Sequence, residues 1–291
     1  MFDFHIHLAR LPHQKQLTQL FCNGNYGFIA VACEPWEWKI VADLKKEFST
    51  EQKPFKASYG IHPMIATQAD DEMFAKLRSA LEEDEIAMVG EAGIDKRYPG
   101  YDDGTQDQIF ITQAKLALEL QRDLQIHCVG DYQRVLKLLA EAGFPQETSQ
   151  GQDAKGLQTL TRLQESPRPI FHRFGGDSRV VKKALAYGAL FSLHEDSFQK
   201  KSTAKAIPLI PQERVFFETD ADETFLQNNH PRHQSSLDGN DREYGECKGD
   251  SGTGSGMTSE SAAGTTTPEE ILTELENTLE SVRAAYAECR E

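Results

Sequence analysis

The stretch LQIHCVGDYQRVLKLLAEAG, residues 124–143, contains one complete strand–turn–helix unit. Its first part, LQIHCVG, is a short apolar run typical of a buried strand, and it ends at a glycine. In the second part, Val135, Leu138 and Leu139 follow helical spacing, and Gly143 closes the run. A strand followed directly by a helix is the building block of parallel sheets.

The same unit recurs along the chain, and helical spacing appears again in TQDQIFITQAKLALELQRD. Eight runs predict buried strands: FDFHIHL (2–8), GFIAVACE (27–34), KASYGIHP (56–63), EIAMVGEAGID (85–95), LQIHCVG (124–130), PRPIFHRFGG (167–176), GALFSLHED (188–196) and RVFFETDAD (214–222). Eight such units in roughly 225 residues match an α/β fold of the (β/α)8 TIM-barrel type, with an open doubly wound sheet as the alternative. We expect the barrel.

The composition divides the chain into three parts. We expect the barrel in residues 1–225, while residues 226–267 are acidic, rich in Gly and Ser and low in apolar residues, which predicts disorder. A capping box formed by Thr267, Pro268 and Glu270 predicts that a helix begins there and runs through 268–291. This amphipathic helix is expected to pack on the barrel through one apolar stripe, made of Ile271, Leu275, Leu279, Val282 and Tyr286.

Charge and cysteine content exclude several classes of protein. The formal net charge of −15 argues against non-specific binding along a nucleic-acid duplex, although a single phosphodiester held by metal ions stays possible. The five cysteines are scattered without a CxxC pair, which indicates free thiols. The chain has no run of about 18 apolar residues and no room for a signal peptide before Phe2, so we expect a soluble, cytoplasmic protein with no membrane span.

The run FDFHIHL places two histidines on one strand. Residues i and i+2 of a strand point the same way, so His5 and His7 should face one side, the barrel lumen, while Phe4, Ile6 and Leu8 face the other. Alone, this spacing fits a metal-binding pair and a hydrogen-bonded structural pair equally well. Further candidates stand near the ends of the later runs, where barrel enzymes build their active sites: His62, Glu91, His127, His172, His194 and Asp220.

Glu91 and Asp220 carry a sharper argument, because an unpaired buried carboxylate costs several kcal/mol. A metal ion would remove this cost; the alternative for both residues is a salt bridge to a neighbouring cation, such as Lys96 or Arg97 in the case of Glu91. Imidazoles and carboxylates together suit Zn, Mn or Mg in a hydrolytic site. One carboxylate that bridged two ions about 3.5–4 Å apart would form a two-metal clamp.

The motifs FDFHIHL, YGIHP, VGEAGID, QIHC, FHRFGG and FETDA, in this order, resemble those of the TatD family of metal-dependent deoxyribonucleases, a branch of the amidohydrolase-like barrels. The resemblance implies two divalent metal ions, with His5, His7 and Asp220 on one and His127 and His172 on the other. It also implies a catalytic pair: Glu91 would bridge the ions, and Asp220 would orient or deprotonate the attacking water. His62 would contact the substrate phosphate.

The function implied by this resemblance is metal-dependent hydrolysis of phosphodiester bonds in DNA, of the 3'-5' exonuclease type, acting on nucleic-acid ends. Three departures bear on the substrate. Val129 stands where the family usually has an arginine, FGG replaces FSG at Phe174–Gly176, and Asp222 stands where a proline normally fixes the turn. His194 also occupies a position that is usually small.

Two alternatives therefore remain open. One is a hydrolase with the same metal centre that cleaves an amide, ester or lactone bond of a small substrate in place of a phosphodiester. The other is a subunit of a larger complex that binds a protein partner through residues 226–291.

Overall fold

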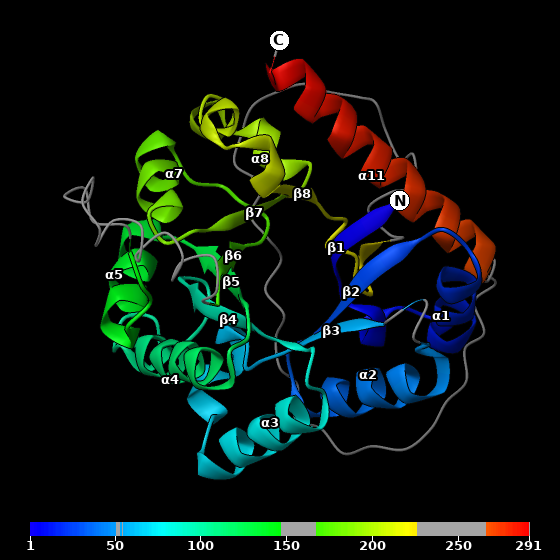
Figure 1. The fold of residues 1–291 in the computed structure, drawn as a ribbon, viewed down its shortest axis with the longest axis horizontal. Helices are drawn as coiled ribbons and strands as arrows, with labels where there is room; N and C mark the ends of the chain where they lie inside the picture. The colour runs from blue at the N-terminus through cyan, green and yellow to red at the C-terminus, as the bar shows by residue number, and fades with distance from the viewer. Residues whose placement is uncertain (51–52, 54, 147–166, 226–265, 291) are drawn as a thin grey trace, which may run out of the picture.

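The structure is a computed structural model that describes residues 1–50, 53, 55–146, 167–225 and 266–290. Eight strands form one sheet in which each strand pairs in parallel with the next along the chain. The strands are β1 (Phe2–Ile6), β2 (Gly27–Ala32), β3 (Lys56–Tyr59), β4 (Met88–Asp95), β5 (Leu124–Val129), β6 (Pro169–Phe171), β7 (Leu190–Leu193) and β8 (Val215–Phe217). Figure 1 shows them around a common centre with the helices outside.

The sheet closes where its last strand returns to its first. Ile6 forms a parallel bridge with Ala221, the His7 N–H donates to the Ala221 carbonyl at 2.9 Å, and the Asp220 N–H donates to the His5 carbonyl at 3.0 Å. A doubly wound sheet would reverse its strand order and leave two open edges. The strand order and this closure confirm the predicted (β/α)8 barrel.

The helices that cover the barrel follow from local capping signals. In α5 (Tyr132–Ala142) the side chain of Asp131 accepts from the N–H groups of Gln133 and Arg134, and Gly143, which follows the last helical residue, has a φ of 97°. The longer helices are α1 (Gln14–Asn23), α2 (Pro35–Phe48), α3 (Asp71–Glu83), α4 (Thr105–Leu120), α5 (Tyr132–Ala142), α7 (Ser178–Leu185) and α11 (Pro268–Arg290). Shorter helices are α8 (Asp196–Gln199), α9 (Lys201–Ala204), η1 (Leu8–Arg10), η2 (Pro63–Gln68), η3 (Ile207–Leu209) and η4 (Gln212–Arg214).

Helix α11 begins at the capping box that the sequence contains. The Thr267 N–H donates to Glu270 Oε2 at 2.7 Å, and the Glu270 N–H donates to Thr267 Oγ1 at 3.2 Å. All five residues of the apolar stripe are buried, and Tyr286 packs edge-on against Phe217 of β8. The helix lies along α1 and over the first and last strands (Figure 1).

The expected disordered segment, 226–267, lies almost entirely outside the described residues, so the division of the chain into three parts stays a prediction. Within the described ranges, no helix has both the length and the hydropathy that crossing a bilayer requires.

An apolar cluster fills the barrel beneath its mouth. Phe4 packs there with Ile29, Val31, Ile170 and other residues, and its ring stacks on that of Phe216 with centroids 4.0 Å apart. The expectation that Phe4 faces away from the lumen is therefore wrong. The register of β1 against β2 shifts between Asp3 and Ile6, which breaks the strict alternation of side chains.

Candidate metal centre

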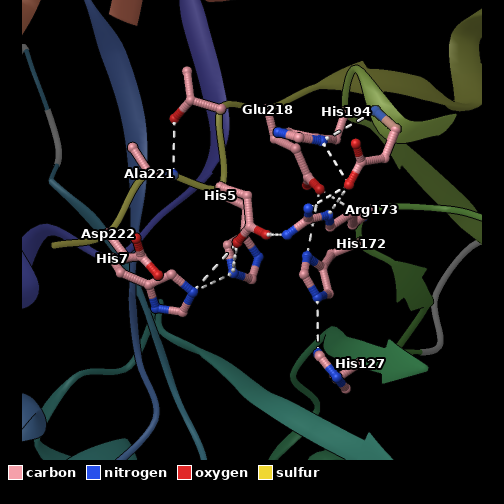
Figure 2. A network of polar contacts seen from close by, with 12 residues as sticks. His5, His7, His127, His172, Arg173, His194, Glu218, Ala221 and Asp222 are labelled. Carbon is pink, nitrogen blue, oxygen red and sulfur yellow. Dashed lines mark hydrogen bonds and ion pairs between the residues drawn. The ribbon is translucent and has the colours of Figure 1, made fainter. Parts of the chain in front are cut away.

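The structure brings all six predicted ligands together at the mouth of the barrel. They lie within five different strands or in the few residues that follow them, and Figure 2 shows several of them facing one another. Five are buried or nearly so, and His7 has a side chain that is 12% exposed. The six are His5 in β1, His7 directly after β1, Glu91 in β4, His127 in β5, His172 after β6 and Asp220 after β8.

Glu91 lies between two pairs of histidines. Its Oε2 is 3.4 Å from His5 Nε2 and 3.7 Å from His7 Nε2. Its other oxygen, Oε1, is 2.6 Å from His172 Nε2 and also contacts His127 Nδ1. Each oxygen of one carboxylate thus serves a different pair of imidazoles.

Glycines allow β4 to bring Glu91 to this point. A Cβ at Gly93 would collide with the backbone carbonyl of His127, and a Cβ at Gly90 would come within 2.8 Å of the Gln125 side chain. Gly90 also has a φ of 137°, a conformation that other residues rarely adopt. The glycines of VGEAGID therefore permit the close approach of β4 to β5.

Asp220 completes the site from the last strand. Its Oδ1 lies 3.3 Å from His7 Nε2 and 3.6 Å from His5 Nε2. Its Oδ2 lies 2.7 Å from Nη1 of Arg173. The salt-bridge alternative therefore holds in part for Asp220, whereas Glu91 is surrounded by histidines.

Two further carboxylates support the histidines from behind. Asp95 Oδ2 is 2.9 Å from His127 Nε2, and Glu218 Oε1 is 3.3 Å from His172 Nδ1. Both are fully buried, and Arg97, proposed above as a partner of Glu91, pairs with Asp95 at 2.5 Å. Carboxylates in this position fix the tautomer and the orientation of a ligating imidazole.

Sequence reasoning did not assign Asp95 and Glu218, although an acidic residue that ends an apolar strand is a usable signal for this role. It also did not assign Cys33, whose buried Sγ lies 3.5 Å from Glu91 Oε2 and 3.8 Å from His7 Nδ1. Burial and the nearby carboxylates hold the pKa of Cys33 well above its usual range, so the thiol is protonated and can donate to Glu91.

Arg173 is the fourth functional residue that sequence reasoning missed. Besides Asp220, its guanidinium binds Asp196, with Nε 3.1 Å from Oδ2, and its backbone N–H donates to Glu218 Oε1 at 2.5 Å. Arg173 and Asp220 have φ values of 42° and 51°, the left-handed region that costs a non-glycine residue about 1 kcal/mol or more. The signal in the sequence was a charged residue directly after a strand-end histidine.

The electrostatics of the site favour a bound cation. Burial raises the pKa of Glu91, but His172 and His127 outweigh it and hold that pKa well below the usual range. Burial likewise opposes the charged form of His7, yet Asp220 and Glu91 raise the pKa of His7 to about 9. Without an ion, protons on the imidazoles balance the carboxylates, and a divalent ion can take the place of these protons.

His62 lies beside the six residues. Its Nδ1 accepts from the Met64 N–H at 3.0 Å, and its Nε2 is 3.8 Å from Glu91 Oε1. Burial and the neighbouring His127 hold the pKa of His62 well below its usual value, so the ring is neutral. Because Nδ1 accepts, Nε2 carries the hydrogen and can donate toward the centre.

His194 takes a different place from the other strand-end candidates. Its Nδ1 accepts from the Asp196 N–H at 3.2 Å, and its own N–H donates to Ser197 Oγ at 3.2 Å. These contacts tie it to the loop that follows β7, at the edge of the network in Figure 2.

The donor atoms fit divalent cations. Among the described residues, four groups have their ligand atoms within 4.8 Å of one another: His5 with His7 and Asp220, His62 with Glu91 and His127, His5 with His172 and Glu218, and His7 with Cys33 and Glu37. Imidazole nitrogens and carboxylate oxygens are the ligands of Zn, Mn and related ions in hydrolytic sites.

Comparisons with known proteins show what the chain is similar to. A family model described as "TatD related DNase" matches residues 2–235. Proteins named "3'-5' ssDNA/RNA exonuclease TatD" are similar: that of Cronobacter turicensis is 27% identical over 165 residues, and that of Escherichia coli K12 is 22% identical over 231 residues. These alignments cover 56% and 76% of this chain, and 55% and 78% of the respective relatives.

The solved structures that resemble the chain support its fold. The TatD homologue YjjV from Escherichia coli K12 superimposes with a TM-score of 0.60 at 20% identity, over 76% of this chain and 79% of that one. A TatD family hydrolase from Entamoeba histolytica gives a TM-score of 0.58 at 17% identity, over 76% and 73%. The chain spans only about half the length of some curated relatives that it matches.

Proposed function

Because the chain belongs to the TatD related DNase family, we propose that it is a metal-dependent nuclease that cleaves phosphodiester bonds at the ends of single-stranded nucleic acid. The 3'-5' polarity is taken from the names of its relatives. The observation that carries the proposal is the placement of Glu91, whose two oxygens face two separate pairs of histidines.

The ligand assignment in this proposal uses all six residues. His5, His7 and Asp220 would hold one ion, His127 and His172 would hold the other, and Glu91 would lie between the two. When bound, two divalent ions supply an activated water and stabilise the negative charge that develops on the phosphate oxygens. Which of Zn, Mn or Mg is native depends on cellular availability as well as on these ligands.

The protein's own groups then have distinct tasks. Asp220 aims Oδ1 into the site and accepts the proton of the attacking water, while Arg173 holds its other oxygen. His62, neutral and protonated on Nε2, donates to a phosphate oxygen of the substrate. Asp95 and Glu218 hold His127 and His172 in their ligating orientations.

A second candidate is an amide, ester or lactone hydrolase that uses the same centre. The acidic residues Asp222 and Glu223, which follow β8, favour it because they would repel a phosphate that approached from their side. A protein partner bound through residues 226–291 and a cytoplasmic location stay predictions from the sequence.

Metal analysis combined with a substrate panel tests the proposal. Wild-type protein, the Glu91→Ala variant and a control, Glu47→Ala, with an exposed carboxylate on α2, are loaded with Zn, Mn or Mg and assayed on single- and double-stranded DNA, RNA and small esters. We expect the wild type and the control to bind two ions and to show nuclease activity. The Glu91→Ala variant should lose the two-ion stoichiometry and the nuclease activity.

Two outcomes would contradict this. Retention of two ions by Glu91→Ala would rule out Glu91 as the bridge. A metal-loaded wild type that turned over esters but no nucleic acid would favour the second candidate.

A further inference from the structure

A cleft of about 500 Å³ opens between the segments that follow β5, β6 and β7. Helices α5 and α7, which begin at this end of the barrel, lie on neighbouring parts of its outer ring in Figure 1. We call it the basic cleft; its lining is Gly130, Asp131, Tyr132, Gln133, Gly175, Gly176, Asp177, Arg179, Val180, Lys183, Lys200 and Ser202.

Three cationic side chains, Arg179, Lys183 and Lys200, outnumber the two carboxylates of Asp131 and Asp177 in the lining of this cleft, in a chain with a net charge of −15. Arg179 pairs with Asp177 at 3.0 Å and is 86% exposed, Lys183 Nζ donates to Gln133 Oε1 at 2.5 Å, and Lys200 Nζ is 3.4 Å from the Gly175 carbonyl. Two of these partners are neutral oxygens, and the third pair is open to solvent. All three cations can therefore turn to an incoming anion at little cost.

Two loops lead from the candidate metal centre to the cleft. Gly130 follows His127 by three positions, and Gly175 follows His172 by three. The Gly175 N–H donates to Tyr132 Oη at 2.8 Å, and its carbonyl accepts from Thr203 Oγ1 at 2.9 Å. These two hydrogen bonds join the loop that follows His172 to residues that follow β5 and β7.

The opposite rim of the barrel mouth carries the opposite charge. There Arg10 forms ion pairs with three carboxylates, those of Glu34, Glu37 and Glu223. Asp222, next to Glu223 in the sequence, brings a fourth carboxylate to this rim. A polyanion is repelled from the rim formed after β1, β2 and β8 and attracted to the rim formed after β5, β6 and β7. The acidic residues near β8 would therefore direct a polyanionic substrate toward the basic cleft.

We infer that the basic cleft binds the phosphodiester backbone of the single-stranded substrate next to the bond that is cut. The inference rests on the proposed nuclease function, and it adds the path that the single-stranded nucleic acid takes across the protein surface. Lysine and arginine contacts to phosphate carry no sequence information, so binding here is independent of base sequence.

Charge-reversal variants test the inference. Lys183→Glu and Lys200→Glu are compared with Lys39→Glu, which changes the net charge equally but lies on α2 in an exposed pair with Asp43. Binding of a fluorescein-labelled single-stranded oligonucleotide is followed by anisotropy in EDTA at several salt concentrations, so that no cleavage occurs. Turnover of the oligonucleotide and of bis(4-nitrophenyl) phosphate is measured separately with metal.

For each cleft variant we expect about a tenfold increase in Kd, as loss of one charge-assisted contact predicts. The slope of log K against log salt should fall by about 0.7 for each phosphate contact that is lost. Turnover of bis(4-nitrophenyl) phosphate, which is too small to reach the cleft, should not change, and Lys39→Glu should resemble the wild type.

The results separate the two proposals. Equal losses of oligonucleotide affinity in Lys183→Glu and Lys39→Glu would overturn the proposed path of the nucleic acid. Equal losses of turnover on the oligonucleotide and on bis(4-nitrophenyl) phosphate would overturn it as well. Cleft-dependent binding in a protein that cleaves no nucleic acid would support the cleft while removing the proposed function.

Discussion

Arg173 binds one oxygen of Asp220, and the other oxygen faces the histidine pair of the first strand. Its Nη1 lies 2.7 Å from Oδ2, while Oδ1 faces His7 Nε2 at 3.3 Å. The guanidinium is itself fixed by Asp196. Oδ2 of Asp220 therefore fixes the position of the side chain, while Oδ1 is directed into the candidate metal centre. Mutation of Arg173 should affect the first task without removing Oδ1.

Replacing Arg173 should impair turnover more than folding. We expect Arg173→Ala to lower kcat on bis(4-nitrophenyl) phosphate by about 10–100-fold, the usual effect of removing a residue that orients a metal ligand. Arg173→Lys should recover only part of this loss, because an ammonium cannot bind Asp196 and Asp220 with the fork geometry of a guanidinium. Arg78→Ala, which removes a surface pair with Glu119, is the control and should be neutral.

Asp95→Asn should weaken one half of the metal site. The amide cannot act as a carboxylate toward His127 Nε2, so the imidazole loses its orienting partner. We expect the affinity for one ion to fall about 10–100-fold, with the other retained, when the metal content is measured after dialysis against graded chelator. Asp123→Asn, which removes a surface partner of Arg168, should keep both ions. Parallel loss of both ions in Asp95→Asn would contradict two partly independent sites.

His62→Ala should separate substrate binding from metal binding. The ring donates from Nε2 toward the site without being one of the six ligands. We expect KM for a phosphodiester to rise about tenfold, the value of one hydrogen bond to a charged oxygen, while the ion content stays unchanged. Loss of an ion from this variant would place His62 among the ligands, as its group with Glu91 and His127 permits.

Asp3 should make the apoprotein less stable as the pH rises toward neutrality. Burial raises the pKa of Asp3 to about 7, although hydrogen bonds from Thr219, His5 and Tyr26 favour the ionised form. The folded state therefore holds this proton more tightly than the unfolded state, whose pKa is 3.8. The free energy of unfolding should fall between about pH 4 and pH 7, by up to about 4 kcal/mol from this group.

Urea denaturation of the metal-free protein in EDTA, repeated between pH 4.5 and 8, measures this effect. The difference between wild type and Asp3→Asn isolates the contribution of Asp3, because other groups titrate in both proteins. The exposed Asp43→Asn variant should keep the wild-type decline. Superimposable pH profiles for wild type and Asp3→Asn would show that Asp3 stays ionised.

The fold and the six candidate ligands could be predicted because their signals are local. A strand is an apolar run of a few residues, and His127 or Asp220 at its end is visible without knowledge of any neighbour. The roles of Asp95, Glu218 and Arg173 depend on contacts between loops of different strands. For example, Arg173 meets Asp220 47 positions later in the chain. No spacing rule encodes such a pair, because its distance is set by the twist and closure of the barrel.

The site also contains the seam of the barrel. The Thr219 hydroxyl donates to Asp3, 216 positions away, and Asp220 and Ala221 share backbone hydrogen bonds with the strand that carries His5 and His7. Contacts between such distant residues cost the most chain entropy and slow folding. An ion held by His5, His7 and Asp220 would bind only after β1 and the segment after β8 have come together, so it would stabilise the closed barrel. The supply of metal would then determine what fraction of newly made chains stays folded.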